Sequence, residues 1–145
     1  MKHLGFGKHL RLLRSNDFQQ VFDHRASRGD RLLVVYGRPV ATSATSPTVG
    51  ESRLGLVVSR RVGNAVRRNR WKRVLREVFR QHRTALPRGY DWVVIPRAGS
   101  TPETMAVTAS LLRLTAQVAR LESRRREDRP QVDGGPPAAP GAERG

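Results

Sequence analysis

A dense group of basic residues is the feature of this sequence with the clearest chemical meaning. The segment VSRRVGNAVRRNRWKRVLREVFR (58–80) places nine Lys and Arg residues within the 21 positions from 60 to 80. Guanidinium groups bind phosphate through paired hydrogen bonds, so a row of them suits a polyanion. The ordinary alternative is a solvated helix face without a ligand. The two interpretations differ in whether nearby acids neutralise the charge.

A helix is predicted from about residue 64 to residue 83, with an apolar face and a basic face. At 100° per residue, the apolar side collects Trp71, Val74, Leu75, Val78 and Phe79. The opposite side carries two rows, Arg68, Lys72, Arg76 and Arg80, and beside them Asn69 and Arg73. Like charges at i, i+4 spacing cost a few tenths of a kcal/mol per pair. Because Glu77 is the only acid on this helix, we favour an anionic ligand over a solvated face.

The start of this helix, RVGNAV, permits two interpretations. The segment supplies a Gly turn and exposed amides at the helix N-terminus, where the helix dipole also favours phosphate. Gly63 and Asn64 are equally an ordinary turn followed by an N-cap. Both interpretations stay open on the sequence alone.

The composition points to an anionic partner, either nucleic acid or an acidic membrane. The net charge is +16 with 28 Lys and Arg residues, and the pI is about 11.8. Residues 122–145 are electrically balanced, so the whole excess lies in residues 1–121. Cys is absent, which fits a reducing cytosol and excludes disulfides and thiol nucleophiles. No apolar run approaches the ~18 residues of a membrane span, and no signal peptide is evident, so we expect a cytoplasmic protein.

The acidic residues do not suggest a catalytic site. A two-metal nuclease needs clustered carboxylates, whereas the acids of residues 1–121 are well separated: Asp17, Asp23, Asp30, Glu51, Glu77, Asp91 and Glu103. The histidines form no metal-binding pattern: His3, His9, His24 and His82. Two histidines brought together by the fold remain a minor alternative. We therefore predict no catalytic and no metal-binding residue in this chain.

The predicted elements have the order α-β-β-α-β-α, with room for one extra short strand. Helices are expected within 14–24, at 64–83 and at 100–121, the last capped by Ser100 or Thr101. Strands are expected at 31–40, 53–59 and 90–98, the first two joined as a hairpin by the polar loop 41–52. This order predicts an α+β fold, a two-layer sandwich of helices on a small, mostly antiparallel sheet. Trp71 and Trp92 are expected in its core.

We expect a single domain over residues 1–121. The remainder, 122–145, is rich in Pro, Gly and charge, which predicts a disordered tail.

The motif at residues 60–73 resembles the protein subunit of bacterial ribonuclease P. Its hallmark is a basic strand end followed by Gly-Asn-Ala-Val, Arg-Asn-Arg and Lys-Arg, read here as RRVGNAVRRNRWKR. Three further segments match: RLLRSNDFQQVF, RLLVVYGRP and RLGLVVS. The resemblance covers roughly residues 10–121.

This resemblance implies a role in tRNA processing. Ribonuclease P is an endoribonuclease that removes the 5′ leader of precursor tRNA. A large RNA carries the catalytic site and holds most of the Mg²⁺, and the small protein binds that RNA and the leader. The implied partners are therefore the catalytic RNA and precursor tRNA, with no membrane and no obligate protein partner. The family fold also implies a left-handed βαβ crossover.

Two sets of site residues follow from the resemblance. The implied contacts to the catalytic RNA are Arg60, Arg61, Asn64, Arg67, Arg68, Asn69, Arg70, Lys72, Arg73 and Arg76. The implied leader-binding cleft comprises Phe18, Phe22, Val34, Tyr36 and Ser59. Aromatic rings can stack on unpaired bases, but simple core packing of Phe18 and Phe22 is an equal alternative.

Two other functions compete. A structural RNA-binding protein of ribosomal type would have the same size and basicity. A DNA-binding protein is less favoured, because the basic helix offers few side chains suited to base edges and no helix-turn-helix is evident.

Overall fold

The strand-forming segments make a four-stranded mixed sheet in the order β1-β2-β4-β3. The computed structural model describes residues 10–40 and 52–128. Its elements are α1 (Ser15–His24), β1 (Ser27–Gly29), β2 (Leu33–Pro39), β3 (Arg53–Leu56), α2 (Ala65–His82), β4 (Tyr90–Pro96) and α3 (Thr104–Asp128). Short 3-10 helices at Arg60–Val62 and Arg83–Ala85 flank α2. The predicted α+β class and element order are confirmed, and β1 is the extra short strand.

The pairing of the strands differs from the prediction. β2 pairs antiparallel with β1 and with β4, whereas β3 pairs parallel with β4. The predicted hairpin between β2 and β3 is therefore wrong, because β4 lies between them. Parallel neighbours need a crossover connection, and α2 supplies it between β3 and β4. The left hand of this crossover stays a prediction from the resemblance.

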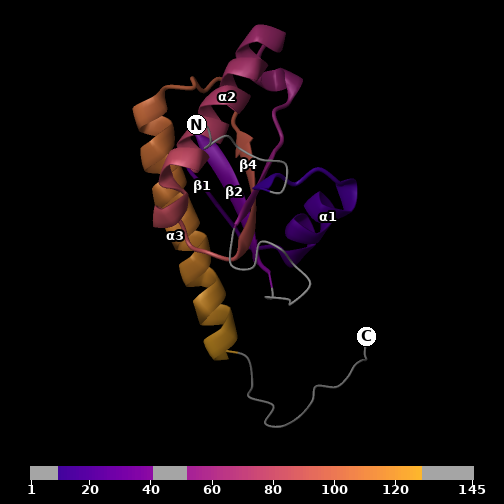
Figure 1. Cartoon of the computed structure of the whole chain (residues 1–145), viewed down its shortest axis with the longest axis vertical. Helices are drawn as coiled ribbons and strands as arrows, with labels where there is room; N and C mark the ends of the chain where they lie inside the picture. The colour runs from indigo at the N-terminus through magenta and orange to yellow at the C-terminus, as the bar shows by residue number, and fades with distance from the viewer. Residues whose placement is uncertain (1–9, 41–51, 129–145) are drawn as a thin grey trace, which may run out of the picture.

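Helices α2 and α3 lie on one face of the sheet and α1 lies on the other (Figure 1), and the two faces carry different apolar clusters. Side chains alternate along each strand, so Leu33 and Val35 of β2 face α2 and α3, while Tyr36 faces α1. The larger cluster includes Trp71, Leu75, Phe79, Trp92, Val94, Leu111, Leu114 and Val118. Trp71 and Trp92 are fully buried, as predicted, and each buried large side chain contributes roughly 1.5–3 kcal/mol.

The first turn of α1 contacts an ion pair that is partly buried within the sheet. Asp91 of β4 is 1% exposed, and its carboxylate accepts from Arg53 Nε at 2.9 Å and Nη2 at 2.7 Å. This hydrogen bonding raises the pKa of the Arg53 guanidinium, which keeps the guanidinium charged. Arg53 Nη1 also lies 3.8 Å from Asp17 Oδ2 in the first turn of α1. The N-terminal end of α1 is thus attached to the sheet.

Helix α3 begins and ends later than predicted. Neither Ser100 nor Thr101 is its cap, since Glu103 Oε1 accepts from the N–H of Ala106 at 2.9 Å. The helix continues to Asp128, so the predicted tail boundary at residue 122 is wrong for residues 122–128. Glu122 is only 8% exposed, which identifies this extension as part of the folded structure. The rest of the predicted tail, 129–145, and the loop 41–51 lie outside the described residues.

Within residues 10–40 and 52–128, no helix combines the length and apolar character needed to cross a membrane.

Candidate nucleic-acid interface

Helix α2 starts at a tight turn formed by Gly63 and Asn64. Asn64 Oδ1 accepts from the Arg67 N–H at 3.0 Å, so Asn64 is an ordinary N-cap. Gly63 has φ 148°, a backbone conformation that L side chains rarely adopt. A Cβ at Gly63 would also lie 2.5 Å from Arg67 Cδ. The turn-and-cap interpretation is therefore confirmed.

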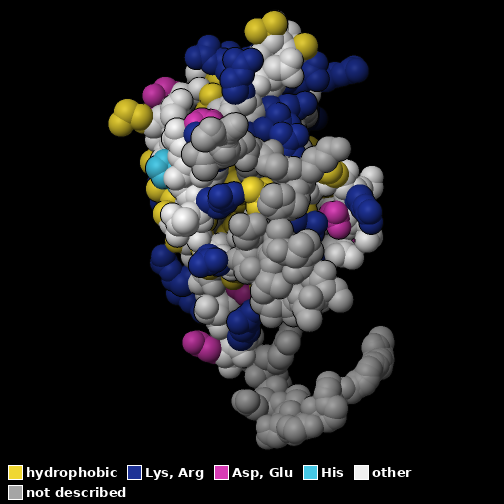
Figure 2. All heavy atoms as spheres, in the orientation of Figure 1, with side chains coloured by type: hydrophobic (Ala, Val, Ile, Leu, Met, Phe, Trp, Pro, Cys, Tyr) yellow, Lys and Arg dark blue, Asp and Glu magenta, His cyan; other side chains and the backbone are white. Residues whose placement is uncertain are grey.

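The predicted RNA-contacting residues gather around the first part of α2. Their exposure differs: the exposed members are Arg60, Arg61, Asn64, Asn69, Arg70 and Arg73, and the half-buried members are Arg67, Arg68, Lys72 and Arg76. Figure 2 shows Lys and Arg side chains collected at the end of the molecule where α2 begins. We define the set Arg68, Asn69, Arg70, Lys72, Arg73 and Arg76 as the basic face of α2.

The basic face of α2 has little neutralising charge. Glu77 is paired with Arg80, whose Nη2 lies 2.5 Å from Glu77 Oε2. Arg80 lies one helical turn beyond Arg76, the last residue predicted to contact RNA. Burial lowers the pKa of the Arg76 guanidinium, and the nearby charge of Arg11 lowers it further. Arg76 remains protonated, because a guanidinium group is not deprotonated in proteins. The face therefore presents a concentrated positive charge.

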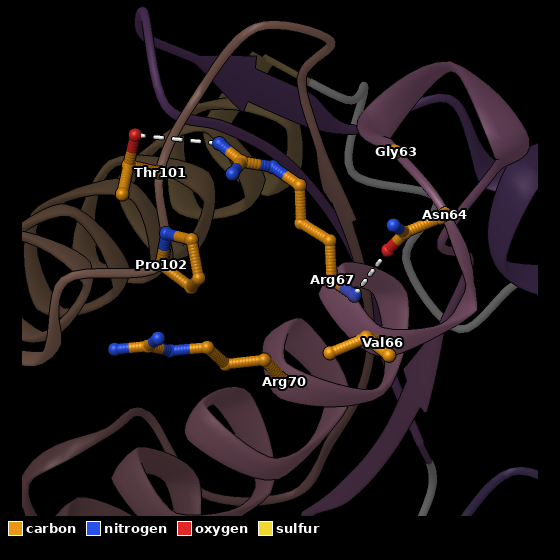
Figure 3. Close-up of a pocket in the computed structure, with 7 residues that line it drawn as sticks. All are labelled: Gly63, Asn64, Val66, Arg67, Arg70, Thr101 and Pro102. Atoms are coloured by element: carbon orange, nitrogen blue, oxygen red, sulfur yellow. Dashed lines mark hydrogen bonds between the residues drawn. The ribbon is translucent and has the colours of Figure 1, made fainter.

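Arg67 has a structural role that its sequence position did not indicate. Its Nη2 donates to the backbone oxygen of Ser100 at 2.9 Å and lies 3.4 Å from Thr101 Oγ1. These bonds join α2 to the loop that precedes α3 (Figure 3). Arg68 is also partly engaged, because its Nε donates to the Gly63 oxygen at 3.3 Å. The sequence predicted both as RNA contacts; the structure engages each of them within the fold.

A groove lies beside the N-terminal half of α2 (Figure 3). It has a volume of about 610 Å³ and is lined by Gly63, Asn64, Val66, Arg67, Arg70, Thr101 and Pro102. A second hollow of similar volume continues along α2 past Val66 and Arg70 to Asn69, Arg73 and Val74. Val66 is 77% exposed, which leaves an aliphatic surface among guanidinium groups. The sequence reasoning missed Val66, Thr101 and Pro102; an exposed Val inside a basic helix was the available signal.

Phe18, Phe22 and Tyr36 form an aromatic patch on the α1 side of the sheet. They pack on buried Leu12, Val21 and Val93 and are themselves only half-buried. The Phe22 and Tyr36 rings meet edge to face, with centroids 4.9 Å apart and planes at 86°. This arrangement serves core packing and leaves ring surface for a ligand, so the two interpretations of Phe18 and Phe22 are compatible.

The other two predicted leader contacts are Val34 on β2 and Ser59 beyond the end of β3. Val34 is half-buried and lies two residues before Tyr36 on β2, so both point to the same face of the sheet. Ser59 follows β3 and is exposed. Its hydroxyl accepts from the Arg61 N–H at 3.3 Å and caps the 3-10 helix. A Cβ on Gly55 would lie 2.6 Å from Phe18 Cε1, so glycine there makes room for the Phe18 ring.

Several acidic side chains of the described residues are used in the fold. Asp91 binds Arg53, Asp30 binds Ser110 and Arg113, and Glu77 binds Arg80. In residues 10–40 and 52–128, no group of three or more His, Cys, Asp or Glu side chains could hold a metal ion. The arrangement suits binding of a polyanion, with charge on one side of the sheet and aromatic rings on the other.

Comparison with known proteins identifies the family. The family model described as Ribonuclease P matches residues 6–120. The ribonuclease P protein component of Bacillus pumilus is 37% identical over 105 residues, which cover 72% of this chain and 83% of the relative. The chain belongs to the ribonuclease P protein family. The resemblance is therefore confirmed, as is the predicted role as a subunit of ribonuclease P, an endoribonuclease.

Solved structures of the family share the fold. The RNase P protein from Thermotoga maritima matches with a TM-score of 0.64 and 35% identity, covering 74% of this chain and 96% of that protein. The RNase P protein of Staphylococcus aureus matches with a TM-score of 0.61 and 30% identity, covering 77% and 95%. The comparisons support an RNA partner within a ribonucleoprotein and give no support to the ribosomal alternative.

Proposed function

We propose that this chain binds the catalytic RNA of ribonuclease P through the basic face of α2. The observation that carries the proposal is the concentration of basic side chains, with Arg70 and Arg73 exposed, beside a groove with an aliphatic surface. Guanidinium groups bind phosphates, and an aliphatic surface among them suits the sugar and base of a nucleotide. Arg70 is exposed and lines both hollows, which makes it the strongest candidate for a direct RNA contact.

The second part of the proposal is that the aromatic patch binds the single-stranded 5′ leader of precursor tRNA. Half-exposed rings stack on unpaired bases whatever their sequence, which suits leaders that differ between tRNAs. The patch lies on the α1 side of the sheet, away from the basic face of α2. One small protein could therefore hold the catalytic RNA on one side and the substrate on the other.

The proposed chemistry belongs to the RNA partner. Mg²⁺ would be held mainly by the catalytic RNA, and this chain would favour cleavage by adding positive charge and by holding the substrate. An enzyme that processes bacterial tRNA would act in the cytoplasm, which is where we place it.

A cleavage assay tests the proposal. Precursor tRNA is incubated with this chain alone, with its cognate catalytic RNA transcribed in vitro, and with both, at low and at high Mg²⁺. We expect no cleavage by the protein alone and a clear stimulation of the RNA at low Mg²⁺. Cleavage by RNA-free protein, or an RNA whose activity the protein never changes, would contradict the proposal.

A further inference from the structure

The C-terminal end of α1 is held by side chains from the last turns of α3. His24 Nε2 lies 2.7 Å from Glu122 Oε1, although the two residues are 98 positions apart. Arg125 Nη1 donates to the backbone oxygen of His24 at 3.0 Å and lies 3.6 Å from Glu122 Oε1. We define His24, Glu122 and Arg125 as the clasp.

The burial of Glu122 indicates that the clasp is a formed contact. Glu122 is only 8% exposed, and a buried carboxylate is costly unless it is paired and hydrogen-bonded. His24 and Arg125 provide those partners, and Arg126 Nε lies 4.0 Å from Glu122 Oε2. The Arg125 guanidinium also satisfies a carbonyl at the end of α1, where helix oxygens lack intrahelical partners.

His24 of the clasp and two rings of the aromatic patch belong to the same short helix, α1. His24 follows Phe22 by two residues, and the chain turns at Arg25, whose N–H donates to the Phe22 oxygen at 3.0 Å. Asp17 in the first turn of α1 contacts Arg53, so α1 is held by charged contacts at both ends. Phe18 and Phe22 lie between these two attachments. A change at either end would move the rings relative to Tyr36.

We propose that Glu122 and Arg125 are positioning residues that fix α1 through His24 and so set how strongly the aromatic patch holds the leader. The proposal rests on the leader site proposed above. The family match ends at residue 120, so the α3 side of the clasp lies beyond the matched region. The helical extension of α3 thereby gains a role in substrate binding without itself touching RNA.

The test compares two clasp variants that change the net charge in opposite directions. Glu122→Ala removes an acid and Arg125→Ala removes a base. The matched controls are Glu127→Ala and Arg124→Ala, exposed residues of the same helix end. Each full-length variant is assembled with the catalytic RNA. Its affinity is measured for a precursor with a long leader and for the same tRNA with a one-nucleotide leader.

We expect both clasp variants to lower the preference for the long leader by roughly threefold to tenfold, with both controls unchanged. A purely electrostatic effect would instead move Glu122→Ala and Arg125→Ala in opposite directions, and that result would overturn the proposal. So would a leader preference that survives intact in both clasp variants. Wild-type enzyme with no leader preference would overturn the proposed leader site, and with it the role of the clasp.

Folding is checked by thermal unfolding of each variant. If Glu122→Ala lowers the melting temperature strongly, Glu122→Gln replaces it, because it keeps the side-chain volume and removes the charge. A Gln variant with an unchanged leader preference and a shifted His24 ring resonance in NMR, which reports a weakened bond to residue 122, would also overturn the proposal.

Discussion

Phe22 and Tyr36 contribute to core packing and also belong to the proposed leader site. Their edge-to-face contact stabilises the packing of α1, and such pairs contribute about 0.5–1.5 kcal/mol beyond their buried area. Both rings stay half-buried, so part of each π face remains available to a base. A residue of this kind is difficult to assign from sequence, since the same apolar spacing predicts either role.

Replacement of Phe22 separates the two uses. Phe22→Ala should weaken binding of leader-bearing precursor by about 1–3 kcal/mol, roughly 5- to 150-fold, because the variant lacks one stacking surface. Tyr36→Phe keeps the ring and should leave the affinity unchanged. Equilibrium binding of the assembled enzyme to long-leader and short-leader precursors measures this. An equal effect on both precursors would argue for a purely structural ring.

At the scale of elements, Arg67 and Arg70 stand one turn apart on α2 and have different uses. Arg67 joins α2 to the loop before α3, whereas Arg70 is exposed beside the groove. Figure 3 shows the two guanidinium groups on either side of Pro102. The sequence motif does not distinguish the two arginines, because the Ser100 oxygen that accepts the Arg67 hydrogen bond lies 33 residues away in sequence.

Substitution of Arg67 and of Arg70 by alanine should affect two different properties, stability and RNA binding. Arg67→Ala should lower the free energy of unfolding by about 1–2 kcal/mol, because it removes charged hydrogen bonds, while Arg70→Ala should leave it unchanged. For binding to the catalytic RNA, Arg70→Ala should flatten the salt dependence by about 0.7–0.9 in log–log slope, the effect of removing one bound phosphate. Urea unfolding and filter binding measure the two effects. An unchanged slope would show that Arg70 is only solvated.

Asp30 connects the β1–β2 turn to α3. Its carboxylate accepts from the N–H groups of Leu32 at 2.8 Å and Leu33 at 2.9 Å, and from Ser110 Oγ at 2.7 Å, and it is paired with Arg113. Burial raises the pKa of Asp30, but these hydrogen bonds and the Arg113 charge together lower the pKa by more, and the net shift is downward. The folded state therefore favours the ionised carboxylate.

The downward shift of the Asp30 pKa determines how the stability of the fold depends on pH. An acid with a lowered pKa contributes stability at pH values above its unfolded pKa of about 3.9, and this stability is lost as the pH falls through the lower folded pKa. Asp30→Asn should therefore reduce the free energy of unfolding at neutral pH, and the difference from wild type should shrink as the pH falls below the unfolded pKa and through the lower folded pKa. Urea titrations across this range measure it. Exposed Glu127→Gln serves as the control.

The positions of the elements were largely predictable, but their partners were not. The runs of β-branched residues that end at a proline predicted β2 and β4 to within two residues of their observed ends. The spacing of Trp71 and Leu75 predicted the buried side of α2. The predicted pairing of β2 with β3 was wrong because β4 lies between them. β4 comes later in the chain and is apolar on both sides, so it occupies the centre of the sheet. The predicted end of α3 was wrong because the charged residues 124–128 resemble a solvated tail. The burial of Glu122 depends on a contact with α1, which the sequence does not show.

At the scale of the whole molecule, the sheet separates the two proposed binding surfaces. The basic face of α2 lies on one side and the aromatic patch on the other. This geometry suits a protein that stands between two RNAs, and it predicts independence of the surfaces, since distant sites without shared partners are additive.

A double variant tests that independence. The effects of Arg70→Ala and Phe22→Ala on precursor cleavage at low Mg²⁺ should multiply, because each acts on a different RNA. Cleavage rates of the wild type, both single variants and the double variant measure the coupling. A double variant no worse than the poorer single variant would place both residues on one surface.

The central place of β4 also governs how the chain folds. β4 joins β2 to β3, yet it is the last of these strands to be synthesised. Until residues 90–96 leave the ribosome, β2 has only β1 and α1 to pack against and β3 lacks its strand partner β4, so the sheet cannot be completed. Non-local pairings of this kind slow folding and expose strand edges. The nascent chain should therefore stay open through most of its synthesis and close in one late step.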